Sequence, residues 1–185
     1  METSYTVDRD QRITCVGGSW DAFATQNDGT EAMAEKVIGH SLWDFVAGFE
    51  VQSYLNAVLF AVRQKSHEFV TQNRCDDRNT ARLFRMTASP LSDGRVKVSH
   101  LLLEQPQIQF PPNPKVLKTF VSHSRCSICC SFKIEEDWVD PFAYPGTQFF
   151  PSSHVVCPAC KGLAREGLGE VVQMPLRKKL ANPKC

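Results

Sequence analysis

The pattern of apolar and polar positions in the first part of the chain predicts one long helix and several short ones. Between residues 51 and 62, apolar side chains recur every three or four positions, as on one buried face of a helix. Shorter helical stretches are predicted at residues 19–24 and 32–38, and Gly39 is expected to end the second of them. Ser41, which an acidic residue follows three positions later, is expected to cap one more helical turn.

Apolar runs on both sides of this helical block predict the strands of a sheet. They lie at residues 5–7, 13–16, 68–75, 81–88 and 96–103. In the fourth run, alternation places Phe84, Met86 and Ala88 on one face of the strand and Arg85 on the other. Strands that are split around a block of helices predict an α+β fold with the helices on one face of the sheet.

Two close cysteine pairs in the second half of the chain predict a metal site. The pairs are Cys126 with Cys129, and Cys157 with Cys160. A two-residue gap lets a tight turn direct both sulfurs at one point, and two such turns can form the tetrahedral cage that structural zinc takes. Two disulfides, a redox pair and an iron–sulfur cluster are the alternatives, but reduced thiols in a cytosolic chain favour zinc.

Other residues near the pairs could replace one of the four cysteines as a ligand. Cys130 follows Cys129 directly, and His123 and His154 each lie three residues before the first cysteine of a pair. A site with three cysteines and one histidine is therefore an alternative, although the four paired cysteines are the expected ligands.

Composition divides the chain into two parts. Residues 106–115 are rich in proline, which predicts a semi-rigid linker. We therefore expect a first domain at residues 1–105, a small zinc-stabilised C-terminal module at 116–168 and a basic, disordered tail at 169–185. The first 105 residues carry a net charge of −3 and the remainder +4, a mild asymmetry that a solvated surface explains more simply than nucleic acid does.

The order of elements, together with the segment V-I-G-H-S-L-W-D-F-V at residues 37–46, resembles a PAS domain. The resemblance covers about residues 4–105. It implies a PAS-like five-stranded antiparallel sheet that cups a pocket beneath short helices, and a role in sensing, dimerisation or signal relay. The cysteine pairs with Trp138 resemble extensions that follow PAS domains in some bacterial signalling proteins.

The ligand of the expected pocket is unknown, and the pocket could hold none. Its apolar candidates are Trp20, Phe23, Trp43, Phe45, Val58, Phe84 and Met86. The simpler and favoured interpretation is that these side chains fill the core, as aromatic stripes at helical spacing usually do. His40 is the nearest candidate for a haem ligand, whereas His100 is expected in the core or on the sheet surface. The reactive-cysteine motif of flavin photosensors is not found in the sequence.

These features predict a non-enzymatic, cytoplasmic, bacterial signalling protein in which a PAS-like sensor is coupled to a zinc module. The sequence has no nucleophile elbow, phosphate-binding glycine loop or kinase signature. A signalling protein is the expected partner, with a homodimer through the PAS-like domain as a further possibility and no membrane contact. The alternatives are a thiol redox switch that uses the paired cysteines and a nucleic-acid-binding regulator.

Overall fold

A five-stranded antiparallel sheet forms the first part of the molecule. The computed structural model describes residues 1–76, 80–106, 123–143 and 151–169. The strands of the sheet are β1 (Glu2–Val7), β2 (Ile13–Gly18), β3 (Phe69–Arg74), β4 (Leu83–Pro90) and β5 (Val96–Glu104). They lie in the order β2-β1-β5-β4-β3, and each neighbouring pair is antiparallel. The predicted α+β class is therefore confirmed.

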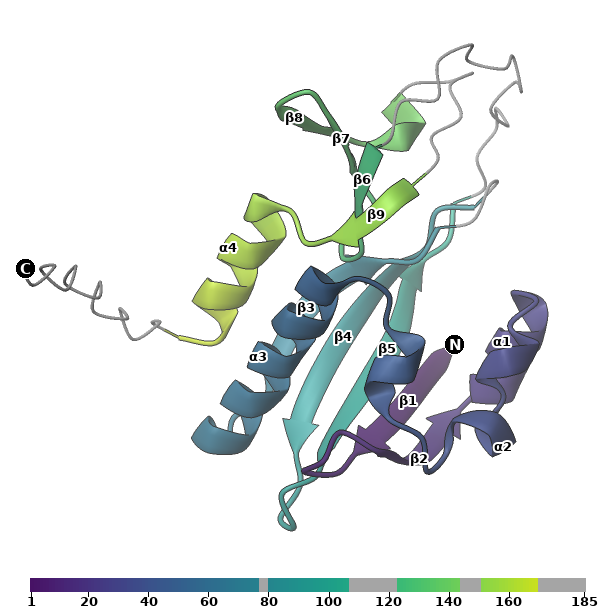
Figure 1. Cartoon of the computed structure of the whole chain (residues 1–185). Helices are drawn as coiled ribbons and strands as arrows, with labels where there is room; N and C mark the ends of the chain where they lie inside the picture. Colours follow the sequence, from purple (N-terminus) through teal and green to yellow (C-terminus); the bar gives the residue numbers. More distant parts are fainter. Residues whose placement is uncertain (77–79, 107–122, 144–150, 170–185) are drawn as a thin grey trace, which may run out of the picture.

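Helices cover one face of this sheet (Figure 1). They are α1 (Trp20–Gln26), η1 (Thr30–Ala32), α2 (Ala34–Val37), η2 (Leu42–Phe45) and α3 (Phe49–Lys65). Ser41 begins η2, and its side chain accepts a hydrogen bond from the Trp43 amide at 3.3 Å. Ser19 stands at the start of α1 without a side-chain cap. The long helix agrees with its predicted periodicity, because Val51, Val58 and Val62 are buried.

The register of β4 is the one that alternation predicts. Phe84 and Met86 are 3% and 4% exposed, and Ala88 is fully buried. Arg85, which points to the other face, is exposed. Met86 and Ala88 share a core with Val58 of α3, while Phe84 meets the ring of Phe23 from α1. The two helices therefore pack on the same face of the sheet.

A second, smaller sheet lies in the C-terminal part. It contains β6 (His123–Cys126), β7 (Phe132–Ile134), β8 (Asp137–Val139) and β9 (Pro151–Val155) in the order β8-β7-β6-β9. The helices are η3 (Pro141–Ala143) and α4 (Pro158–Gly167). β6 and β9 pair in parallel, so the segment between them must return across the sheet. Figure 1 shows this part at the end of the large sheet, near the beginning of α3.

The two parts pack against each other through α4. Ala164 of α4 belongs to the core of the large sheet, and the ring of Phe69 lies against Gly167. Lys65 at the end of α3 donates hydrogen bonds to the carbonyls of Leu168 and Gly169. The proline-rich linker from residue 107 onward and the tail from residue 170 lie outside the described residues. The division into separate domains stays a prediction.

No helix in the described ranges is both long enough and apolar enough to cross a membrane.

Candidate metal centre

Four cysteine sulfurs meet at one point between the small sheet and α4. The Sγ atoms of Cys126, Cys129, Cys157 and Cys160 all lie within 4.8 Å of one another. Those of Cys129 and Cys157 are 3.8 Å apart. Three of the four residues are buried, and Cys129 is partly exposed. The structure thus brings together the two pairs that the sequence spacing singled out.

Local backbone geometry directs each pair. Cys126 ends β6 opposite Val155 of β9, so the parallel pairing of these strands places the two turns side by side. The first turn closes when the Cys130 amide donates to the Cys126 carbonyl at 3.0 Å. Cys130 itself adopts the left-handed conformation, with a φ of 63°. Cys157 stands at the N-terminus of α4, where Pro158 suits the first helical position.

Backbone amides point at the sulfurs of both pairs. The amides of Ile128 and Cys157 donate to Cys126 Sγ at 3.4 and 3.3 Å. The Cys160 amide donates to Cys157 Sγ at 3.4 Å. Hydrogen bonds to a charged acceptor are stronger than those to a neutral one. These amide donors would therefore stabilise the negative charge of metal-bound thiolates.

The pKa values of the clustered thiols depend on burial and on the neighbouring sulfurs. Hydrogen bonds with Cys126 and Cys160 lower the pKa of Cys129. Hydrogen bonds to the sulfurs of Cys126 and Cys129 raise the pKa of Cys160, and burial raises the pKa of Cys157. These shifts run in opposite directions within one group of sulfurs. A divalent cation binds the deprotonated sulfurs, so metal binding at this group would be coupled to proton release.

The geometry and the surroundings of the sulfurs fit a single metal ion. Zinc–sulfur bonds of about 2.3 Å in a tetrahedron place the sulfurs about 3.8 Å apart, the distance found between Cys129 and Cys157. The hydroxyl of Tyr54 is buried and has no hydrogen-bond partner among the described residues, and its ring packs against the cysteine cluster. Burial raises the Tyr54 pKa to about 12, and the charges of Cys160 and Cys126 add to the effect. The tyrosine therefore stays a neutral donor beside the sulfurs.

The three alternative ligands lie outside this group of sulfurs. His123 Nδ1 is 3.2 Å from the carbonyl of Lys133. Cys130 Sγ donates to the carbonyl of Arg74 at 3.4 Å, and burial raises the pKa of its thiol to about 11. The main chain of His154 lies against Gly48. The left-handed turn at Cys130 explains why its side chain points away from its neighbours.

The metal centre is joined to α3 through Glu50. Its carboxylate accepts a hydrogen bond from the amide of Val156 at 3.3 Å, one residue before Cys157. It also pairs with Lys161 of α4 at 3.2 Å. One half-exposed acidic side chain at the start of α3 therefore holds both the end of β9 and the first turns of α4.

Arg74 joins the centre to the end of β3. Its amide donates to the carbonyl of Ile128 at 2.7 Å, inside the first cysteine turn. Its guanidinium forms 2.6 Å ion pairs with Asp76 and with Asp140 and lies 5.1 Å above the ring of Phe142. Sequence reasoning missed this arginine, because its partners named here, other than Asp76, come from segments far along the chain.

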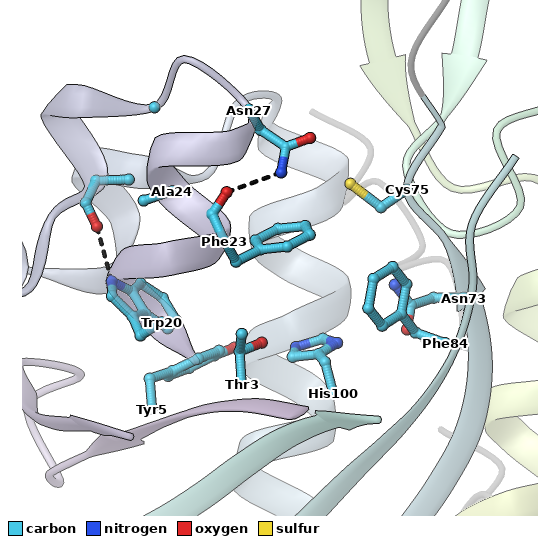
Figure 2. Close-up of a pocket in the computed structure, with 12 residues that line it drawn as sticks. Thr3, Tyr5, Trp20, Phe23, Ala24, Asn27, Asn73, Cys75, Phe84 and His100 are labelled. Atoms are coloured by element: carbon cyan, nitrogen blue, oxygen red, sulfur yellow. Dashed lines mark hydrogen bonds between the residues drawn. The ribbon is translucent and has the colours of Figure 1, made fainter. Parts of the chain in front are cut away.

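A cavity of about 330 Å³ lies on the helix-covered face of the large sheet (Figure 2). Of the seven apolar candidates, only Trp20, Phe23 and Phe84 line it. Val58 and Met86 are part of the core instead. Trp43 is half-buried and packs against that core, whereas Phe45 is 42% exposed. His40 is exposed, and His100 lines the cavity.

No protein-family model matches this sequence, and no curated protein matches it significantly.

Proposed function

We propose that this chain is a non-enzymatic signalling protein, in which a PAS-like sensor domain is coupled to a structural zinc centre. The five-stranded antiparallel sheet and the cavity beneath short helices support the PAS-like reading, since both are features that the resemblance implies. The domain acts by binding rather than by catalysis. A homodimer and a signalling partner protein remain predictions.

We assign zinc to this group of sulfurs, because a closed site of four cysteines is typical of structural zinc. Sulfurs that all lie within 4.8 Å of one another suit one central ion, because a cluster of several irons would hold its thiolates farther apart. Four cysteine ligands leave no open position, as in structural sites. The buried Tyr54 hydroxyl would then donate to a thiolate, a neighbouring interaction of the kind that orients metal ligands.

The end of β3 is the observation that carries this proposal. Asn73 and Cys75 line the cavity, while Arg74 between them is bonded to the first cysteine turn. Successive residues of a strand point to opposite faces. A change in the cavity would therefore act on the metal centre through one strand end.

Metal analysis of the full chain, purified under reducing conditions, tests the zinc centre. We expect about one zinc per chain, full retention in Cys130→Ser and strong loss in Cys157→Ser. The pair separates a ligand from a buried cysteine outside the group, because Cys157 Sγ belongs to the four sulfurs and Cys130 Sγ bonds to Arg74 instead. Equal metal content in the two variants, or iron in place of zinc, would contradict the assignment.

Nuclear magnetic resonance of the labelled chain tests the coupling. Chelation should shift the amide signals of Asn73, Arg74 and Cys75 more than those of the opposite edge strand β2, which has no bond to the cysteine turns among the described residues. Unchanged signals at these three residues after complete metal removal would refute the relay.

A further inference from the structure

The cavity on the large sheet has walls made mostly of aromatic rings. Figure 2 shows Tyr5, Trp20, Phe23, Phe84 and His100 directed toward the same space. They come from β1, α1, β4 and β5, so the cavity lies where α1 crosses the end of the sheet. Rings from several elements offer flat apolar surfaces to one occupant.

These rings hold one another in place without a ligand. Phe23 and Phe84 meet edge to face, with centroids 6.0 Å apart at 85°. Tyr5 and His100 are stacked, with centroids 6.3 Å apart at 24°. Trp20 Nε1 donates to the carbonyl of Ala32 at 2.7 Å, which fixes the indole ring. A preformed site of this kind loses little conformational entropy when it binds.

The cavity offers no charge to a ligand. Asp, Glu, Lys and Arg are absent from the described residues that line it. Burial lowers the pKa of His100 to about 4, so the imidazole is neutral near pH 7. Burial also raises the pKa of Tyr5, which keeps its hydroxyl protonated. An ionised ligand would be desolvated there without a counter-charge, which is unfavourable.

One buried polar atom at the cavity lacks a partner. Asn73 Oδ1 has no hydrogen bond within the described structure. Asn27, the other amide of the lining, donates to the carbonyl of Phe23 at 2.8 Å. An unpaired buried acceptor is unfavourable, and a donor on a bound molecule would remove that penalty.

We infer that this cavity binds an uncharged, planar aromatic molecule of about two fused rings, with one N–H or O–H group directed at Asn73. The size follows from volume, because an apolar cavity of about 150 Å³ holds one benzene ring, and this one measures about 330 Å³. Only the biological role of this ligand rests on the proposed function, in which the molecule would be the signal that the sensor domain receives.

Binding of three matched probes to the zinc-containing full chain tests the inference. Indole has two fused rings and a donor, benzothiophene has the same shape without the donor, and indole-3-acetate carries a negative charge. In ¹H–¹⁵N spectra, indole should give saturable shifts at Asn73 and His100. Benzothiophene should bind about tenfold more weakly, which is the effect of one neutral hydrogen bond, and indole-3-acetate more weakly still.

Two variants on β3 separate the hydrogen bond from general effects on the strand. Asn73→Leu keeps the volume and removes the acceptor, so indole and benzothiophene should then bind about equally. Gln72→Leu, on the exposed opposite face, should keep the wild-type preference. No saturable shift with either neutral probe would overturn the inference, and equal binding of both to the wild-type chain would overturn the role of Asn73. The same samples also report on the proposed function. If they contain zinc and chelation shifts the signals of β3, then only the inferred ligand class is contradicted, and the proposed function is not.

Discussion

Replacing Gly48 by alanine would test how closely the metal centre is joined to the start of α3. Gly48 has a φ of 89° and precedes the first helical residue. A Cβ atom built there lies 2.3 Å from the carbonyl oxygen of His154 and 3.1 Å from its carbon. Ordinary contact begins near 3.4 Å, so the end of β9 must move by about 1 Å. That strand leads directly into Cys157.

The expected loss of stability has two parts. A non-glycine residue in a sparsely populated backbone conformation costs about 1–3 kcal/mol. Forcing an extra carbon into a filled contact costs about 1–3 kcal/mol more. Gly39→Ala is the matched control, because Gly39 has a φ of 86° and an added Cβ would meet no atom of the described residues within 4 Å. We therefore expect about 4 kcal/mol for Gly48→Ala and about 2 kcal/mol for Gly39→Ala.

Urea unfolding of the two variants measures this difference. Under the proposed zinc centre, the rate of zinc transfer to a chelator measures its effect on the site. The displaced β9 end weakens the bond between the Val156 amide and Glu50, so zinc should leave Gly48→Ala faster than it leaves Gly39→Ala. Equal stability and equal release rates in the two variants would show that the His154 carbonyl of β9 is not in tight contact with Gly48. That result would refute the prediction.

Two further predictions concern the large sheet. Phe84→Ala should lower the free energy of unfolding by ~3–5 kcal/mol, whereas Arg85→Ala on the exposed face should change it little; equal effects in chemical denaturation would refute the register. The folded-state pKa of His100 is lowered to about 4 from about 6.5 in the unfolded chain. The unfolded state therefore takes up the proton first, and stability should fall by up to about 3 kcal/mol as pH drops from about 6.5 to about 4. His100→Phe should remove that part of the decline, and a variant with an unchanged pH profile would contradict a buried neutral imidazole.

The local patterns in the sequence predict the large sheet well, because periodicity is a property of neighbouring residues. Alternation in β4 is enough to place Phe84 and Met86 inside. The spacing of the cysteine pairs likewise predicts which four sulfurs meet. The four paired cysteines were the expected ligands rather than Cys130, and the left-handed turn directs the Cys130 sulfur at Arg74 instead.

Features that depend on contacts between distant segments could not be predicted in this way. The parallel pairing of β6 with β9 has no local pattern, since the two strands are joined by a long connection. Ala164 enters the core of the large sheet only because α4 packs beside β3, although its sequence neighbours indicate a separate module. For the same reason Trp43 and Val58 were placed among the cavity candidates, whereas they pack in or against the core.

Helix α4 has a consequence for the lifetime of the protein in a cell. Its first turn carries Cys160, and Ala164 one turn later fills the core of the large sheet. Under the proposed function, zinc stabilises the native state by mass action, and a chain without it would populate open forms more often. Proteases act on such forms, so a stability change of about 1–2 kcal/mol can alter abundance several-fold. The amount of this protein would then follow the supply of zinc, even at a constant rate of synthesis.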